Sequence, residues 1–195
     1  MNYIHYSGIP GSGKTSLCLV ESRKNLEDDS RVFWLSGRSL DPQRFSQIMT
    51  DLSISKASKF HLLNFKSNER ESSFENGINQ IIRMCNQLKS TSLIIIDDWD
   101  YDMEKYEKST RINKISELVE CSKDNSINVY LTSKSYENLS DDENKYSARA
   151  ASDLEKIGFN NQIISEGDLE NEYIITGSNG KIVFRIIGTG IEFIE

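Results

Sequence analysis

The chain has 195 residues, and its 30 acidic and 23 basic side chains leave a net charge of −7 at neutral pH. This length is typical of one domain with a substantial core, and no apolar run approaches the roughly 20 residues of a membrane span, so we expect no membrane partner. The negative charge disfavours a general nucleic-acid coat, because neutralising phosphates requires clustered Lys and Arg.

The start of the chain and its cysteines favour a cytoplasmic protein. The first residues, MNYIHYSG, lack the basic start and the long apolar stretch of a signal peptide. Cys18, Cys85 and Cys121 are widely spaced and have no metal-ligand spacing. We therefore expect small buried thiols in a reducing cytosol.

Short apolar runs alternate with segments of helical period as far as residue 133. In chain order the predicted elements are a strand at Tyr3–Ser7, a helix to about Asn25, a strand at Arg31–Ser36, a helix from Pro42, a strand at 59–65, a helix from about Ser73 to Lys89, a strand at 92–97, a helix around Ile112–Val119 and a strand at 127–133. This alternation predicts an α/β fold with a mostly parallel central sheet flanked by helices.

Two of the predicted helices begin with a capping pattern. Asp41 is the expected N-cap of the second helix, and Pro42 takes the first helical position, where its missing N–H costs nothing. Ser72 and Glu75 have the spacing of a capping box at the start of the third helix.

The character of the chain changes after Ser133. Residues 134–153 are polar and acidic, and we predict a loop there. The rest of the chain is rich in β-forming residues, and an Asn-Gly turn at 178–180, between EYIIT and KIVFRII, predicts a hairpin. We expect this antiparallel hairpin to extend the parallel sheet within a single domain, residues 1–195, because no linker interrupts the chain.

Residues Gly8–Thr15, GIPGSGKT, match the full phosphate-binding loop pattern G-x-x-x-x-G-K-[ST]. They follow a predicted strand and open a predicted helix, which is the context that the motif requires. The glycines allow backbone N–H groups to point at phosphates, and the helix N-terminus adds partial positive charge. Lys14 is the expected catalytic cation that bridges the β- and γ-phosphates, and the Thr15 hydroxyl is an expected Mg²⁺ ligand.

An acidic partner for this loop is predicted at the end of the strand 92–97. Asp97 closes the apolar run and is expected to hold Mg²⁺ together with Thr15. Asp98 follows it and is the candidate catalytic carboxylate, because a second carboxylate beside the metal can polarise an attacking water. Asp100 and Asp102 are interpreted as part of a solvated acidic turn.

Adenine is favoured as the base by elimination. The segments NKIS at 113–116 and NKYS at 144–147 lack the carboxylate of a guanine-reading Asn-Lys-x-Asp motif. Thr132, Ser133 and Lys134 end a strand and are suited to sense the γ-phosphate, although ordinary strand-end polarity explains them equally well. The expected cofactors are therefore ATP and Mg²⁺. The expected nucleotide-binding residues are Gly8, Pro10, Gly11, Ser12, Gly13, Lys14, Thr15, Ser16 and Ser133.

The order of these parts resembles the RecA-like recombinase core, and it is most similar to archaeal RadB and other recombinase paralogues. The Pro-x-Arg-Phe element of that family is matched by Pro42–Phe45. Its C-terminal hairpin pattern is similar to Phe184–Ile186 followed by Gly190-Ile191. The resemblance spans nearly the whole chain and implies a RecA-like ATPase core that binds ATP with Mg²⁺.

The departures from that family concern catalysis and DNA. RecA-like ATPases carry a catalytic Glu just after the second strand, where this chain has Leu35-Ser36-Gly37-Arg38, and their strand-tip Thr-Asn-Gln is replaced by Thr132-Ser133-Lys134. Almost nothing precedes the phosphate loop, so we expect neither an N-terminal DNA-binding domain nor a polymerisation segment. The segments 98–108 and 137–145, which would face DNA, are rich in carboxylates.

These features favour an ATP-binding paralogue that assists homologous recombination or DNA repair by engaging a recombinase or paralogue subunit. Hydrolysis is expected to be weak or partner-dependent, and DNA binding is disfavoured by charge. The alternative is a small nucleotide or nucleoside kinase, although its phosphate-clamping lid would be the mostly acidic segment 134–150 with Arg149 as its single arginine. A nucleotide-independent scaffold is disfavoured because Lys14, Thr15 and Asp97 are intact.

Overall fold

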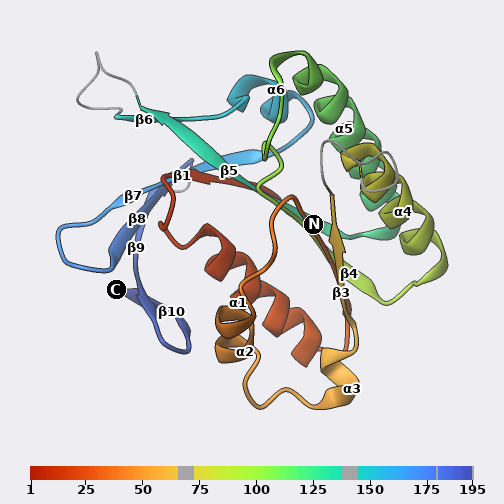
Figure 1. The fold of residues 1–195 in the computed structure, drawn as a ribbon, viewed down its shortest axis with the longest axis horizontal. Helices are drawn as coiled ribbons and strands as arrows, with labels where there is room; N and C mark the ends of the chain where they lie inside the picture. Colours follow the sequence, from red (N-terminus) through yellow and green to blue (C-terminus); the bar gives the residue numbers. More distant parts are fainter. Residues whose placement is uncertain (66–72, 138–144, 179, 195) are drawn as a thin grey trace.

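The computed structural model describes residues 1–65, 73–137, 145–178 and 180–194. Over these ranges the strands join into one ten-stranded sheet, and helices cover both of its faces (Figure 1). The strands are β1 (Tyr3–Gly8), β2 (Arg31–Ser36), β3 (Phe60–Asn64), β4 (Thr91–Asp97), β5 (Asn128–Glu137), β6 (Tyr146–Ala148), β7 (Asn160–Glu166), β8 (Glu172–Gly177), β9 (Gly180–Ile187) and β10 (Gly190–Ile194). The helices are α1 (Lys14–Glu27), α2 (Pro42–Ile48), α3 (Ile54–Ala57), α4 (Phe74–Gln87), the 3₁₀ turn η2 (Lys105–Glu107), α5 (Lys108–Asn125) and α6 (Ala151–Lys156).

The order of strands across the sheet is β10-β9-β8-β7-β1-β5-β4-β2-β3, with β6 paired to β5. The strands from β3 across to β7 pair in parallel, and β7 to β10 pair antiparallel. The predicted fold class is thus confirmed, with a larger antiparallel extension than the single hairpin expected. Gly177 lies opposite Gly180 at the predicted turn, whose Asn179 lies outside the described residues.

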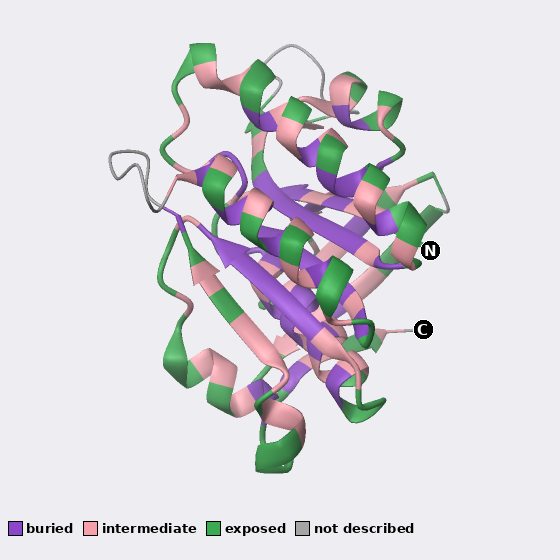
Figure 2. Ribbon diagram, turned by 90° about the vertical axis from the view of Figure 1, so that its right-hand side faces the viewer, coloured by how far each residue is buried: buried purple, intermediate pink, exposed green. Residues whose placement is uncertain are grey.

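The central strands β2 and β4 are buried on both faces, which accounts for their continuous apolar sequences. Alternate residues of these strands enter two different cores. Phe33 and Ile94 pack in the core beneath α4 and α5, whereas Trp34 and Ile95 pack in the core beneath α1 and α2. Figure 2 shows the consequence, because the central strands are buried while the outward faces of the helices are exposed.

The starts of α2 and α4 follow from local chemistry. The Asp41 side chain accepts hydrogen bonds from the backbone N–H groups of Gln43 and Arg44, and Pro42 begins α2, as predicted. The predicted cap of α4 is wrong by one residue. Ser73 is the N-cap, and its hydroxyl accepts from the N–H of Asn76, whereas Ser72 lies outside the described residues.

The prediction of a loop over residues 134–153 is wrong for its described parts. Strand β5 continues to Glu137 and pairs with β6, so that Ser135 lies opposite Ala148, and α6 begins at Ala151. Backbone pairing with a distant segment creates β6, and burial of Leu154 fixes α6. Neither the β5–β6 pairing nor the packing of Leu154 can be predicted from the polar composition of the segment. Among the described residues no helix has the length and apolar character needed to cross a membrane.

Candidate functional site

The phosphate loop lies between the end of β1 and the start of α1. Gly11 and Gly13 have φ angles of 85° and 84°, the left-handed region that favours glycine. A Cβ on Gly13 would lie 3.0 Å from Ile186 Cδ1, so the loop also packs tightly against β9. The first turn of α1 carries no acidic side chain, and its N–H groups lack helical partners. The loop therefore presents a helix end of the kind that is suited to hold an anion.

Lys14 is folded back over the loop that precedes it. Its Nζ donates hydrogen bonds of 2.8 Å to the carbonyl oxygens of Gly8 and Ile9, and the residue is buried. Burial lowers the pKa of Lys14, and the neighbouring carboxylates of Asp98 and Asp97 oppose that shift. The ammonium group is thus held at the mouth of the loop by carbonyls and by nearby negative charge.

Thr15 of α1, Asp97 at the carboxyl end of β4 and Thr132 in the middle of β5 meet at one point. The Thr15 hydroxyl donates to the two carboxylate oxygens of Asp97 at 3.2 and 3.3 Å. Thr132 donates to Asp97 Oδ1 at 2.7 Å. Burial, together with the charge of Asp98, raises the pKa of Asp97 to about 6. The two predicted metal ligands, Thr15 and Asp97, are therefore in direct contact although they are far apart in sequence.

Asp98, the predicted catalytic carboxylate, has a constrained backbone. Its φ angle is 53°, in the left-handed region, and its N–H donates to Thr132 Oγ1 at 2.7 Å. Its carboxylate forms an ion pair with Arg38, with Oδ2 and Nε 3.1 Å apart. Asp100, interpreted from sequence as solvated, is instead buried and paired with Arg149 at 3.1 Å.

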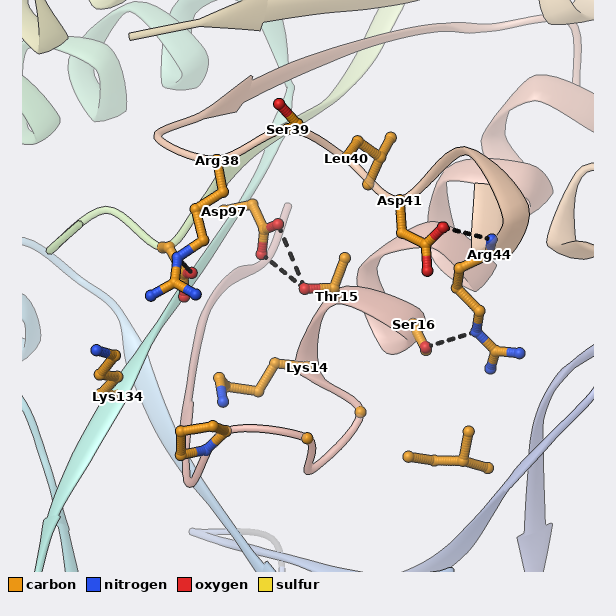
Figure 3. A pocket seen from close by; sticks show the side chains of 15 residues that line it. Lys14, Thr15, Ser16, Arg38, Ser39, Leu40, Asp41, Arg44, Asp97 and Lys134 are labelled. Atoms are coloured by element: carbon orange, nitrogen blue, oxygen red, sulfur yellow. Dashed lines mark hydrogen bonds and ion pairs between the residues drawn. The ribbon is translucent and has the colours of Figure 1, made fainter. Parts of the chain in front are cut away.

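A cavity of about 640 Å³ opens over the loop. It is lined by Pro10, Gly11, Gly13, Lys14, Thr15, Ser16, Arg38, Ser39, Leu40, Asp41, Arg44, Asp97, Asp98, Lys134 and Ile186. Figure 3 shows Arg38, Asp97 and Lys134 toward one end, with Asp41 and Arg44 toward the other. Most of the predicted site residues thus surround one space.

Three predicted nucleotide-binding residues are not among the residues that line this cavity. Gly8 contributes a carbonyl to Lys14, and Ser12 is fully buried. Ser133 is also fully buried, and its hydroxyl is hydrogen-bonded to His5 Nε2 at 2.8 Å and to Ser7 at 3.1 Å. In place of Ser133, the next residue, Lys134, reaches the cavity.

Arg44 is a cavity residue that sequence reasoning did not assign to the site. Its guanidinium donates to the Ser16 hydroxyl at 2.9 Å and to the carbonyl oxygens of Ile187 and Gly190, both at 2.7 Å. It therefore ties α2 to the first turn of α1 and to the turn between β9 and β10. Its place in the Pro42–Phe45 element, which matches a motif of the recombinase family, was the sequence feature that could have indicated a role for Arg44 at the site.

The donor set fits a magnesium nucleotide. Two left-handed glycines shape a cradle at a helix N-terminus, with Lys14 at its mouth. Thr15 and Asp97 supply a hydroxyl and a carboxylate in contact with each other, the oxygen ligands that Mg²⁺ prefers. These residues would hold the phosphates and the metal, and the metal would neutralise phosphate charge.

The fold and the loop together define an α/β protein with a phosphate loop at the carboxyl edge of a mostly parallel sheet. No protein-family model and no curated protein sequence matches the chain. Among solved structures, the chain is similar to the crystal structure of the RadB recombinase, with a TM-score of 0.75 and 16% identity over 98% of this chain and 90% of that one. The fold is thus RecA-like and of the RadB type.

Proposed function

We propose that this chain is an ATP-binding, RadB-like recombinase paralogue that assists homologous recombination or DNA repair. The observation that carries the proposal is the contact of Thr15 with Asp97 beside Lys14, at one end of a 640 Å³ cavity. This is the arrangement that a phosphate loop and an acidic strand end need to hold a triphosphate with Mg²⁺. The likeness in fold to the RadB recombinase supports the recombination role.

Weak hydrolysis is part of the proposal. The stretch after β2, where RecA-like ATPases carry a catalytic Glu, brings Arg38 to the cavity instead. Besides Asp97, the proposed metal ligand, two carboxylates line the cavity. Asp41 caps α2, and Asp98 is paired with Arg38. Asp41 is thus engaged whether or not nucleotide is bound, and Asp98 is engaged until its pair with Arg38 opens. We expect turnover without a partner to lie well below about 1 s⁻¹, the lower end of typical enzyme rates.

The proposed partner is a protein subunit of the recombinase or paralogue type. We propose that this chain binds it as a single ATPase-core domain in the cytoplasm. The net charge of −7 supports a protein partner over DNA as the main contact. The acidic segment after Asp98 supports the same choice, because its carboxylates would repel a phosphate backbone.

The test of nucleotide binding is thermal and chemical unfolding with ATP and Mg²⁺. ATP at 100 times its Kd should stabilise the protein by about 2.7 kcal/mol. Lys14→Ala should lose this stabilisation, and Lys123→Ala, an exposed lysine paired with Glu120 on α5, should keep it. An equal ATP effect in Lys14→Ala and the unmodified protein would contradict binding at this loop.

A small nucleotide or nucleoside kinase is the second candidate, because a second cavity of about 300 Å³ adjoins the first. Its lining includes the cations Arg38, Lys134 and Arg149, and a kinase needs cations near its phosphate acceptor. However, Arg38 and Arg149 are engaged by Asp98 and Asp100. Phosphate transfer from ATP to any member of a nucleoside and nucleotide panel would favour this candidate.

A further inference from the structure

We propose that Arg38 is the residue with which this chain distinguishes ATP from ADP. In the structure its guanidinium is held by Asp98, and we infer that a γ-phosphate takes Asp98's place as its partner. The inference rests on the proposed nucleotide binding and assigns Arg38, for which no role follows from the phosphate-loop motif, as a nucleotide-sensing residue.

The position of the pair supports this role. Arg38 and Asp98 line the same cavity as Lys14, and Figure 3 shows Arg38 at the end where Asp97 and Lys134 also lie. Thr15 and Asp97 would hold the metal of a bound nucleotide, and such a metal supplies charge neutralisation for the terminal phosphates. The terminal phosphate would therefore be the part of the nucleotide that comes nearest to the pair.

The backbone on both sides of the ion pair is fixed. Asp98 is held in the left-handed region by the hydrogen bond from its N–H to Thr132. On the other side, the Arg38 N–H donates to Ser36 Oγ at 3.2 Å. Gly37 packs so closely on Tyr101 that an added Cβ would lie 2.6 Å from Tyr101 Cβ. The chain thus brings the two charged side chains to the cavity from rigid positions.

The ion pair itself is open to exchange. The Arg38 side chain is 52% exposed and that of Asp98 is 22% exposed, and ion pairs this open to solvent contribute little to stability. The Arg38 guanidinium also lies 5.0 Å from the centre of the Tyr101 ring. This cation–π contact would keep the guanidinium at the cavity whichever anion it pairs with.

Charge decides which partner Arg38 prefers. A γ-phosphate would bring up to two negative charges beside Asp98, repelling that carboxylate and attracting the guanidinium. The planar fork of an arginine matches phosphate oxygens better than a point charge does. With ADP no phosphate extends to this end of the cavity, so Arg38 keeps its pair with Asp98. The expected result is tighter binding of ATP that depends on Arg38.

The test is the affinity for ATP and for ADP, both with Mg²⁺, measured by titration calorimetry. Arg38→Ala should weaken ATP binding by about tenfold or more, the effect of losing one charge-assisted hydrogen bond, and should leave ADP binding within about twofold. Asp98→Asn should strengthen ATP binding, because it releases Arg38. Asn suits this variant since it tolerates the left-handed backbone.

The matched control is Arg185→Ala. Arg185 pairs with Glu172 on β8 and β9 at 3.3 Å, is 40% exposed and does not line the cavity. Its removal should change neither affinity. An unchanged ratio of ATP to ADP affinity in Arg38→Ala would overturn the inference while leaving nucleotide binding intact. Failure of the unmodified protein to bind either nucleotide would overturn the proposed function as well.

Discussion

Thr132→Val removes one hydroxyl on which two groups of the site depend. Thr132 is fully buried, donates to Asp97 at 2.7 Å and accepts from the Asp98 N–H at 2.7 Å. Valine has nearly the same shape but no hydrogen-bonding group. The substitution therefore removes one hydrogen-bond donor from the buried Asp97 carboxylate and the Thr132 acceptor from the Asp98 N–H. It creates no cavity.

The size of the effect follows from these two bonds. A hydrogen bond to a charged group contributes about 1.5–3 kcal/mol, and an unsatisfied buried N–H costs about 1–3 kcal/mol. Because solvent reaches Asp98 in part, we take a total near the low end, about 3 kcal/mol. Thr132→Ser is the matched control, since it keeps the hydroxyl and loses only a buried methyl, about 0.8 kcal/mol.

The assay is equilibrium unfolding in urea without nucleotide. With a denaturant slope of about 3 kcal/mol/M, the valine variant should unfold at a midpoint about 1 M lower than the unmodified protein, with the slope unchanged. The serine variant should lose about a quarter of that. Equal stabilities for the valine and serine variants would refute the reasoning, because the hydroxyl would then contribute nothing.

Three further predictions concern other parts of the fold. Burial lowers the pKa of His5 from 6.5 to about 4, so His5 should lower the unfolding free energy by about 3 kcal/mol as pH falls from 6.5 to 4. Asp97, whose pKa burial raises to about 6, acts in the opposite direction over the same range, so the contribution of His5 is measured as the difference between urea titrations of the unmodified protein and of His5→Gln. Gly8→Ala should lower stability by about 1–3 kcal/mol, because its Cβ would lie 2.7 Å from the Ile164 carbonyl oxygen. Arg44→Ala should cost about 2 kcal/mol in the same assay through its lost bonds to Ser16 and to the β9–β10 turn.

Each of these predictions has a matched comparison. His5→Gln lacks the contribution of His5, so parallel pH profiles for this variant and the unmodified protein would contradict the lowered pKa of His5. Gly188→Ala meets nothing within 4 Å and should be nearly neutral, so equal losses at both glycines would contradict the packing argument. Arg44→Lys keeps the charge but not the fork, and full stability in that variant would mean that charge alone suffices.

Local patterns were enough to predict much of the site. The phosphate loop is contiguous, so Gly8–Thr15 could be read directly, and Asp97 was marked by the apolar run that it ends. The pairing of Asp97 with Thr15 follows because parallel strands end at the same edge of a sheet. The error at Ser133 has an equally simple cause. Side chains alternate along β5, so Thr132 and Lys134 share the face of the site while Ser133 points away to His5.

The sequence by itself determined the alternation of strands and helices as far as residue 133, the fold class and the loop with its acidic partner, because these depend on periodicity and on contiguous motifs. Only the tertiary structure decided which charges meet. Arg38 and Asp98 are paired, as are Arg149 and Asp100, and Arg44 reaches carbonyls of the β9–β10 turn. Such contacts join residues that are far apart in the chain. Which residues meet is set by how strands and helices pack, and a local sequence pattern contains no information about that packing.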